Sequence, residues 1–404
     1  MRVLLSAFAC SPGWGSEPGV GWGWATSLAD IGHEVTVLTS SRFREPILAA
    51  NPPGIEFHFI DNPEPSFGRF SPSWGMYESY LRWQEVALRQ VEAAGRRYDV
   101  AHHVTWGSLR LGSQLWRLPV PLIYGPIGGG QVSPVSYWRF FGREWAAETL
   151  RTASRSLLVL NHRSRETIRN SAVTLACNSA TAAVSRRLGG ADVRYMLPDG
   201  LPCDWVVAAR RRPAGVPVVL WVGRLIPIKA PMLAVQAFAE LRRAMPARLV
   251  IVGDGPLRGQ LHTAVESRGL AGDVDLLGRV TWDDVRQMYD SASVFLFTSL
   301  RDSFGAQFLE ALGRGLPAVA LDHHGIADVD AGPAAVKVAL ARRPRDLPGR
   351  LASALQTVLG HNEWALRSAA AVDWAAGHVW PAKAAAATQI YSEVLRTRAG
   401  LHAA

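Results

Sequence analysis

The sequence predicts an α/β protein of two domains, each organised around a parallel sheet. Its 404 residues exceed what one ordinary hydrophobic core holds, so two domains are expected. Short apolar runs typical of strands alternate with longer helical stretches along the whole chain, as in the crossover units of parallel sheets. The runs fall into two series, one for each predicted domain.

The two series are separated by a punctuated stretch near residue 200. The strand candidates of the first are Val3–Ala9, Glu34–Thr39, Ile55–Ile60, Asp99–His103, Pro121–Tyr124 and Leu175–Cys177. Those of the second are Val218–Val222, Arg248–Val252, Val274–Leu277, Ser293–Thr298 and Leu316–Leu321. The seam, residues 196–205, contains proline and glycine without helical periodicity. We predict domains over 1–198 and 199–380, with a terminal helix in 381–404 that crosses back onto the first domain.

Composition excludes several classes of protein. Charged residues make up 19% and apolar ones 48%, as in a globular chain. Three widely spaced cysteines form neither a disulfide framework nor a zinc pattern, which fits a reducing cytoplasm. No apolar run approaches the roughly 18 residues of a membrane span, and the N-terminus lacks a signal-peptide layout. The net charge of +9 suits an anionic ligand, an anionic membrane or nucleic acid, although solvated arginines would explain it too.

An acidic turn in residues 301–305 lies between an apolar strand and an apolar helix. Ligands of open parallel sheets bind beyond the carboxyl ends of the strands, where this turn is expected. Gly305 lets the backbone approach a ligand, and the amides of Phe304–Ala306 at the helix start favour an anion. Asp302 and Glu310 are spaced to hold two polyol groups that flank a phosphate. Alternatively, Asp302 caps the helix and Glu310 is solvated.

The pattern Asp302-x7-Glu310, followed by Ala311, Gly315 and Pro317, resembles the Glu-x7-Glu signature of retaining nucleotide-sugar glycosyltransferases with the GT-B fold. Their family includes sucrose synthases and bacterial mannosyl- and glucosyltransferases. The resemblance implies two facing Rossmann-like domains with the donor in the cleft between them. It also implies that Asp302 contacts the donor sugar and that Glu310 binds the nucleotide ribose. This sequence departs from the signature by carrying Asp at the first position, which shortens the reach of the carboxylate.

Two cations follow the strand candidate 218–222. Gly223 and Arg224 end that strand, and Lys229 precedes the next helix. Arg offers a fork of donors and Lys a point charge, and together they neutralise a diphosphate. The family has a similar element, in which Arg and Lys hold the donor diphosphate. Alternatively, these are two exposed cations on a loop.

Two further glycine turns are similar to the family's nucleotide site. The Val-Gly-Asp-Gly-Pro turn at 252–256 matches the family, and Gly253 is expected to have a mainly structural role near the nucleotide. By resemblance, the loop Gly278-Arg279-Val280 lines the base pocket. Thr281 is expected to cap the following helix. Asp pairs with D-x-D spacing occur at 273–275 and 328–330, but this spacing is common by chance and we do not assign a metal to it.

The first domain begins with a strand and a glycine-rich loop. By resemblance, the Gly15-Ser16 pair approaches the donor phosphate. Ser16 or Glu17 is expected to cap the helix that follows, with Pro18 in its first position.

Two adjacent histidines, His102 and His103, end the strand candidate Asp99–His103. In the family a histidine at this place contacts the donor sugar. Neighbouring residues on a strand point to opposite faces, so one of the two is expected to face the cleft, and we favour His103. The alternative is that both are structural.

The segment 137–170 is basic and aromatic, with seven arginines and three glutamates. A segment of this kind is able to lie on an anionic membrane surface, and the family often works on lipid-linked acceptors. A solvated face above a buried apolar stripe is an equally good interpretation.

Together these elements predict a hexosyltransferase of EC 2.4 type. It would move a glycosyl group from a nucleoside-diphosphate sugar to a sugar, lipid-linked or natural-product acceptor, with retention at the anomeric carbon. The donor would bind the C-terminal domain and the acceptor the N-terminal one. Cations and helix amides would stabilise the leaving diphosphate, so neither a metal nor a cofactor is expected. We predict a cytoplasmic protein of cell-envelope or polysaccharide biosynthesis, at the inner membrane face if 137–170 binds lipid, without a nucleic-acid partner.

Three other functions compete with this prediction. A nucleotide-sugar epimerase or phosphorylase of related fold is the main alternative. A NAD-dependent oxidoreductase would require G-x-G-x-x-G after the first strand, which is absent. A non-catalytic glycan-binding scaffold is distinguished by the lack of donor turnover.

Overall fold

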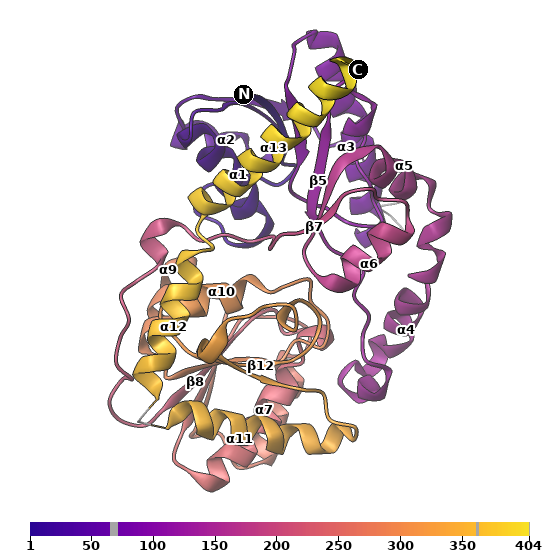
Figure 1. Ribbon diagram of the computed structural model, residues 1–404. Helices are drawn as coiled ribbons and strands as arrows, with labels where there is room; N and C mark the ends of the chain where they lie inside the picture. The colour runs from indigo at the N-terminus through magenta and orange to yellow at the C-terminus, as the bar shows by residue number, and fades with distance from the viewer. Residues whose placement is uncertain (65–71, 361–362, 404) are drawn as a thin grey trace. The chain divides into compact units, whose positions relative to one another are not determined.

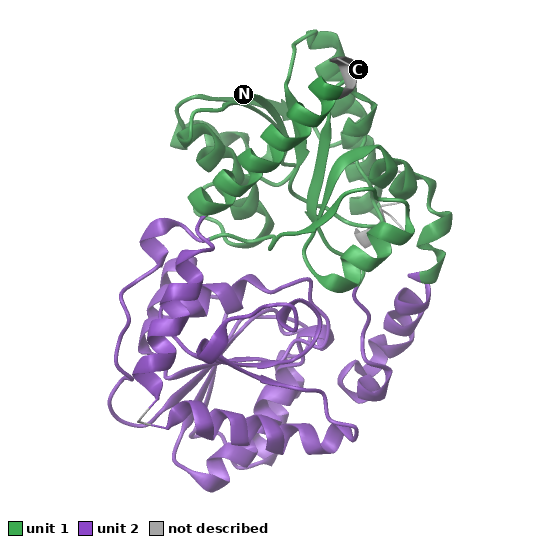
Figure 2. Ribbon diagram, in the orientation of Figure 1, with its two compact units in different colours: residues 1–130, 156–200, 380–404 green, residues 131–155, 201–379 purple. Residues whose placement is uncertain are grey.

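The computed structural model describes residues 1–64, 72–360 and 363–403, which form two compact units (Figure 1). Unit 1 comprises Met1–Gly130, Ser156–Gly200 and Trp380–Ala404, and unit 2 comprises Gln131–Arg155 and Leu201–Val379 (Figure 2). Each unit is an α/β domain with a parallel sheet, so the predicted fold class is confirmed.

Within the described residues, unit 1 has a seven-stranded parallel sheet in the order β3-β2-β1-β4-β5-β6-β7. The strands are β1 (Arg2–Ser6), β2 (Glu34–Ser40), β3 (Ile55–Ile60), β4 (Val100–His103), β5 (Leu122–Ile127), β6 (Ser171–Ala176) and β7 (Val193–Tyr195). The helices are α1 (Ser16–Asp30), α2 (Arg44–Ala50), α3 (Pro72–Ala94), α5 (His162–Asn170), α6 (Ser179–Arg187) and α13 (Trp380–Ala403). The central strands have nearly continuous apolar sequences because helices cover both faces of a parallel sheet.

Helix α13 packs against α1 in unit 1 (Figure 1). Gly23 of α1 makes this approach possible, since a Cβ there would lie 2.2 Å from the ring of Trp380. Farther along α13, Thr388 binds the His33 ring at 2.7 Å. The last helix of the chain is therefore part of the core of unit 1.

Within the described residues, unit 2 has a six-stranded parallel sheet in the order β10-β9-β8-β11-β12-β13. The strands are β8 (Val218–Val222), β9 (Arg248–Val252), β10 (Val274–Gly278), β11 (Val294–Phe297), β12 (Ala318–Leu321) and β13 (Ala335–Val338). The helices are α4 (Trp145–Ala153), α7 (Pro231–Ala244), α8 (Arg258–Ser267), α9 (Trp282–Ser291), α10 (Ala306–Gly313), α11 (Leu347–Leu359) and α12 (Trp364–Ala376). Helices α7 and α11 pack together beside the sheet.

The segment 131–155 connects β5 to β6, yet it packs with unit 2. Tyr137 and Phe141 enter the apolar core of unit 2, and the Tyr137 hydroxyl donates to the Ala341 carbonyl at 3.0 Å. The sequence-based boundary had assigned this segment to the first domain. The difference arises because its packing partners are some 200 residues away in the chain.

The start of α1 differs from its prediction. The helix begins at Ser16, Gly15 is the N-cap residue without a side-chain cap, and Pro18 lies in the third position. The Glu17 carboxylate instead accepts a hydrogen bond from the Trp106 amide at 3.0 Å, which ties α1 to the loop after β4.

Candidate functional site

The candidate site lies at the carboxyl edge of the unit 2 sheet. Because β8 to β12 are parallel, the turns that follow them meet at this edge. Most of the residues predicted to bind the donor belong to these turns. The exceptions are Glu310, which lies on helix α10, and Gly15, Ser16, His102 and His103, which lie in unit 1.

Lys229 and Asp302 form an ion pair at this edge. The ammonium comes from the loop after β8 and the carboxylate from the turn after β11, and their side chains are 13% and 20% exposed. Asp302 also accepts hydrogen bonds from the Ser299 hydroxyl at 3.3 Å and the Ser303 amide at 2.9 Å. The two residues were predicted to bind diphosphate and sugar separately, and in this structure they hold each other.

The loop that carries Lys229 is fixed by the end of β11. The Thr298 hydroxyl lies 3.0 Å from the carbonyls of both Lys229 and Ala230, and it accepts from the Trp221 indole at 2.9 Å. The Leu300 amide donates to Ile228 at 2.8 Å. These contacts fix the backbone of the loop from which the Lys229 side chain extends.

Arg224 is exposed, and no ion pair of its side chain is found among the described residues. Arg279, in the loop after β10, is likewise exposed. An unpaired guanidinium at a strand end remains available for a phosphate fork. The geometry thus leaves Arg224 free for the anion-binding role that the sequence predicted.

Gly223 and Gly253 hold two of the turns together. Gly253 has a φ of +131°, and a Cβ at this position would lie 1.9 Å from the Gly223 carbonyl oxygen. The Gly253 amide also donates to the Gly278 carbonyl at 2.8 Å. Only glycine permits this contact, so Gly253 has the structural role expected for it.

Gly305 allows α10 to begin directly after the acidic turn. Its φ is +105°, and a Cβ would lie 2.4 Å from the Phe297 ring. Phe304 is buried beside it and packs on Phe308. The amides that open α10, from Gly305 and Ala306 onward, lie next to Asp302, where helix geometry leaves them without helical acceptors.

Glu310 is buried on the second turn of α10, with 9% of its surface exposed. Its carboxylate accepts a hydrogen bond from Tyr289 of α9 at 2.9 Å. Burial raises the pKa of Glu310, whereas the Tyr289 hydrogen bond lowers it. The alternative of a solvated Glu310 is therefore wrong. Tyr289 was missed, because no motif in the sequence marks it as a partner.

The loop after β10 leads into a well-capped helix. Thr281 and Asp284 form a reciprocal capping box at the start of α9, which confirms the predicted cap. Val280, half-buried, precedes this cap, so the predicted base-pocket loop has a fixed end.

The two histidines of unit 1 point to opposite faces of β4, and both are fully buried. The His102 ring binds Tyr391 at 2.5 Å and the Gly125 carbonyl at 2.7 Å. The His103 ring binds Tyr80 at 3.1 Å and Ser113 at 3.0 Å. Both ring nitrogens of each are thus occupied, which contradicts the prediction that one of them faces a ligand.

Burial also sets the charge of this pair. It lowers the pKa of His102 to about 3 and that of His103 to about 4. The two imidazoles are accordingly neutral near pH 7 and serve as hydrogen-bonding core residues.

The predicted glycine loop of unit 1 is exposed at Ser16 and half-buried at Gly15. Ser16 has a φ of +60°, a conformation that residues with a side chain rarely adopt. The loop follows β1 at the carboxyl edge of the unit 1 sheet.

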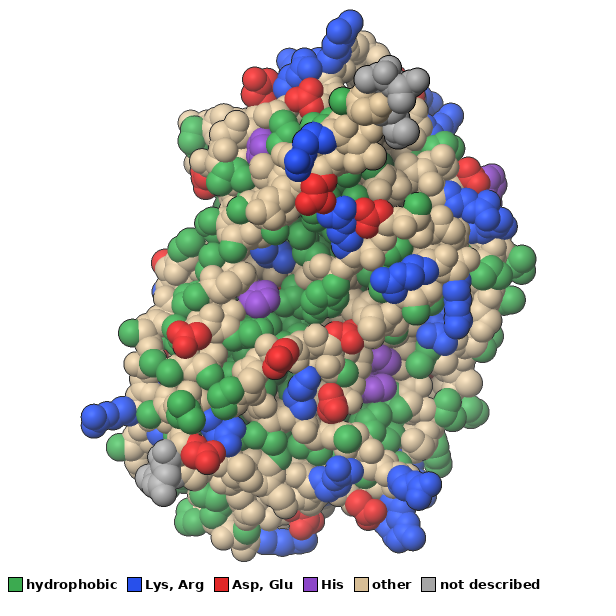
Figure 3. Space-filling model, viewed as in Figure 1, with side chains coloured by type: hydrophobic (Ala, Val, Ile, Leu, Met, Phe, Trp, Pro, Cys, Tyr) green, Lys and Arg blue, Asp and Glu red, His purple; other side chains and the backbone are tan. Residues whose placement is uncertain are grey.

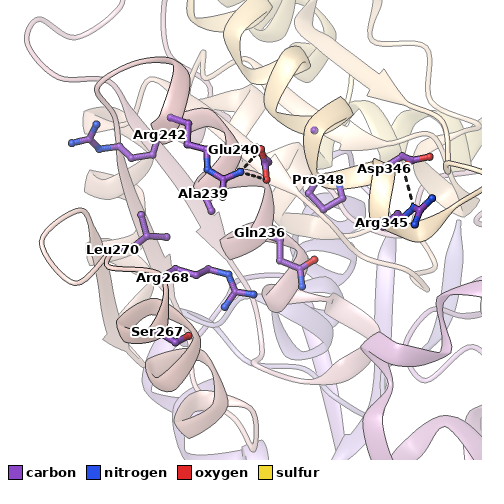
Figure 4. A pocket seen from close by; sticks show the side chains of 12 residues that line it. Gln236, Ala239, Glu240, Arg242, Ser267, Arg268, Leu270, Arg345, Asp346 and Pro348 are labelled. Carbon is purple, nitrogen blue, oxygen red and sulfur yellow. Dashed lines mark hydrogen bonds and ion pairs between the residues drawn. The ribbon is translucent and has the colours of Figure 1, made fainter.

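Unit 2 also has a hollow whose lining residues are not those of the candidate site (Figure 4). It has a volume of about 800 Å³ and is lined by α7, the end of α8 and the start of α11. Its charged side chains already have partners: Arg243 binds Glu240 and Arg242 binds Asp273. We assign no ligand to it.

Charged side chains of both signs are spread over one face of the molecule. On the face visible in Figure 3, Lys and Arg side chains are interspersed with Asp and Glu rather than gathered in a stripe. Asp273 and Asp275 are paired with Arg242 and Arg248, respectively.

Comparison with known proteins gives a family match within unit 2 and matches to individual proteins over larger parts of the chain. Residues 216–361, within unit 2, match the model of the family "Glycosyl transferases group 1". A D-inositol 3-phosphate glycosyltransferase of Corynebacterium efficiens is 32% identical over 50% of this chain, but the match spans only about half of that protein, 49%. One from Kineococcus radiotolerans is 28% identical over 93% of this chain and 89% of its own length.

Solved structures that resemble this chain show its fold. Sucrose-phosphate synthase from Thermosynechococcus elongatus has a TM-score of 0.72 at 18% identity and covers 98% of this chain and 100% of its own. HepE from Anabaena, in complex with UDP, has a TM-score of 0.64 at 17% identity and covers 98% and 100%. These comparisons show the GT-B fold, and the resemblance to group 1 glycosyltransferases in the family model covers residues 216–361. The proposal of a nucleotide-sugar epimerase or phosphorylase is not favoured.

Proposed function

We propose that this chain is a glycosyltransferase, which uses a nucleoside-diphosphate sugar as donor and transfers the sugar with retention of anomeric configuration. The observation that carries the proposal is the grouping of Arg224, Lys229 and Asp302 at the strand ends of unit 2, beside the first amides of α10. Cations and amides suit a diphosphate, and Asp302 suits the hydroxyls of a sugar. The acceptor would be a sugar, a lipid-linked glycan or a natural product.

In this proposal the ion pair between Lys229 and Asp302 is a resting arrangement. A diphosphate carries more negative charge than one carboxylate and would draw Lys229 to itself together with Arg224. Asp302, still oriented by Ser299 and Ser303, would then accept hydrogen bonds from the donor sugar. The two cations would stabilise the leaving diphosphate as negative charge develops on it.

Glu310 would act on the other end of the donor. Its carboxylate shares a hydrogen bond with Tyr289 and is positioned by α10, so a ribose hydroxyl would join or replace an existing polar contact. A buried carboxylate without such partners would be costly, which supports a role for Tyr289 in keeping Glu310 ready for a ligand.

A donor screen tests the proposal. Thermal unfolding would be measured with UDP, GDP and their common sugar conjugates, because ligands raise the stability of the state that they bind. We expect one conjugate to raise the Tm of the wild type, and Arg224→Ala and Glu310→Ala to abolish the shift and the turnover of that donor. No stabilisation by any nucleotide, or unchanged turnover in both variants, would refute it.

Transfer of label separates this function from its alternatives. With a donor labelled in the sugar, a transferase delivers the label to a distinct acceptor, whereas an epimerase returns it on the nucleotide. A phosphorylase would require inorganic phosphate. Retention would be read from the anomeric configuration of the product by NMR.

We also propose that the segment 135–150 binds an anionic membrane surface. Trp138 and Trp145 are 53% and 49% exposed and line one small hollow with Val135, which is more exposed still. The Arg139 guanidinium lies over the Trp138 ring at 5.6 Å. Aromatic rings beside arginines suit an interface with anionic lipids. None of the described helices is long and apolar enough to cross a membrane.

Vesicle sedimentation tests this second proposal. We expect binding to phosphatidylcholine vesicles only when they contain phosphatidylglycerol, and a loss of at least five-fold in the double variant Trp138→Ser/Trp145→Ser. Trp14→Ser is the matched control, since Trp14 is 60% exposed in unit 1 and outside the segment. Equal binding by the double variant and the control would refute the proposal.

A further inference from the structure

The residues on both sides of Asp302 are held by the segment 131–155. Arg301 forms an ion pair with Glu148, with 2.8 Å between Nε and Oε1. Ser303 accepts a hydrogen bond from the Gln131 side-chain amide at 2.9 Å. The acidic turn is thus held at Arg301 and Ser303, the residues before and after Asp302, by a segment more than 140 residues earlier in the chain.

Glu148 is the centre of a buried polar cluster. Besides Arg301, it accepts hydrogen bonds from Ser133 at 2.5 Å and from Arg151 at 2.7 Å. Only 9% of its surface is exposed. Its single negative charge therefore balances two guanidinium groups, and removing it would leave both of them half-buried without that partner.

The charges of the cluster are consistent with this geometry. Burial alone would raise the pKa of Glu148, but the hydrogen bonds from Arg151 and Ser133 and the charge of Arg301 bring it below its ordinary value. Glu148 is consequently ionised at neutral pH.

The segment is attached to unit 2 in two independent ways. Tyr137 and Phe141 anchor it through the apolar core, and the Tyr137 hydroxyl donates to the Ala341 carbonyl, which is not part of the acidic turn. These apolar contacts are sufficient to attach the segment to unit 2. The polar contacts of Gln131 and Glu148 instead end on Ser303 and Arg301, the two neighbours of Asp302.

We infer that Gln131 and Glu148 are positioning residues for glycosyl transfer, which fix the Arg301–Ser303 turn so that Asp302 is presented to the donor sugar. The role of Asp302 in this inference rests on the proposed function, whereas the control of the turn does not. Gln131 and Glu148 act through their neighbours and need not touch the donor themselves.

Hydrogen exchange tests the control of the turn without any ligand. Peptides that cover 299–306 would be compared between wild type, Glu148→Gln and Gln131→Ala. We expect exchange in this turn to rise about ten-fold in Glu148→Gln and less in Gln131→Ala. Glu240→Gln, which breaks an ion pair on α7, is the matched control and should leave the turn unchanged. Unchanged exchange in both test variants would overturn the inference.

Kinetics test the consequence for transfer. UDP or GDP, whichever binds the wild type, should keep its Kd within about two-fold in the variants, since neither nucleotide carries the sugar. The kcat for the matching nucleotide sugar should fall at least ten-fold in Glu148→Gln, with partial retention in Glu148→Asp. Equal losses in nucleotide affinity and kcat would indicate general damage and overturn the positioning role.

The two arms separate the possible failures. If the wild type turns over none of the nucleotide sugars, the proposed function fails, and the exchange experiment still decides whether Glu148 and Gln131 hold the turn. If Glu148→Gln does not fold, Gln131→Ala removes a neutral contact and carries both measurements.

Discussion

Each unit carries a pair of adjacent histidines at the carboxyl end of a strand, and the two pairs are treated differently. In unit 1, all four ring nitrogens of His102 and His103 have hydrogen-bonding partners. In unit 2, His323 and His324 follow β12 with ring centroids 3.5 Å apart, and the Nε2 atom of each is buried without a partner among the described residues. The histidine pair of unit 1 therefore forms all its hydrogen bonds within the core, whereas each histidine of the unit 2 pair has a ring nitrogen without a hydrogen-bonding partner among the described residues.

The contrast extends to the charges near these strand ends. Unit 1 buries and pairs its two histidines, whereas unit 2 leaves Arg224 exposed and holds the Lys229 ammonium beside Asp302 and the Phe297 ring. Polar groups that are already paired stabilise a fold, and groups left available serve a ligand. The following predictions test this division.

The largest effect is expected for Lys229→Met. If the strand ends of unit 2 serve the donor, losing this ammonium removes charge stabilisation of the leaving diphosphate, and turnover should fall by roughly 100- to 1,000-fold. The free energy of unfolding, measured with urea, should fall by about 1 to 3 kcal/mol, because the two side chains are only 13% and 20% exposed and Asp302 loses its charged partner. A large loss of stability with turnover preserved would show that Lys229 stabilises the fold and does not serve a ligand, contrary to the proposed difference between the units.

The next prediction concerns pH and the buried histidines of unit 1. His103 has a pKa of about 4 when folded and an ordinary value of 6.5 when unfolded, so the unfolded state binds more protons between these values. Stability should therefore fall as pH drops from 6.5 to 4, by about 3 kcal/mol from this residue alone.

Denaturant unfolding at several pH values checks this dependence. His103→Gln cannot take up that proton and should show a shallower loss of stability over the same range. An identical slope for wild type and variant would contradict the assignment of His103 to the core.

A smaller effect is expected when alanine replaces glycine in the two units. Gly305 and Gly32 both have positive φ, at +105° and +87°, but only Gly305 has a neighbour within 4 Å of the place that an added Cβ would take. Gly305→Ala should cost about 2 kcal/mol and Gly32→Ala about 1 kcal/mol, since strain acts in both and the Phe297 contact in one. Equal changes in the urea midpoints of the two variants would show that the Phe297 ring moves away from the added Cβ without loss of stability.

The smallest effect is expected at the helix starts. Thr281→Ala removes the capping box of α9 and should lower the free energy of unfolding by about 1 kcal/mol. Gly15→Ser, at the start of α1 that has no side-chain cap, adds a side-chain acceptor and should instead raise the free energy of unfolding by about 0.3 kcal/mol. Thermal unfolding of the two variants measures the difference.

Periodicity and turn residues were sufficient to predict much of the fold. All the strand candidates overlap observed strands, and the helix start near Ala306 and the cap at Thr281 agree with the structure. Strands β7 and β13 were missed, because three or four residues at a sheet edge carry little periodic signal.

What could not be predicted depended on contacts between distant residues. The burial of His102 follows from Tyr391 of α13, and that of Glu310 from Tyr289 of α9. Likewise, nothing local in residues 131–155 indicates that Tyr137 and Phe141 belong to the core of unit 2. A motif reports which residue types are present, while the partner of each side chain is set by the fold.

The chain passes from one unit to the other at 130–131, 155–156, 200–201 and 379–380. A hybrid enzyme made by joining two parents at residue 200 would therefore combine residues 131–155 of one parent with the acidic turn of the other, and unit 1 of the first with α13 of the second. Such hybrids should fold well only when each of these two segments comes from the same parent as the unit on which it packs.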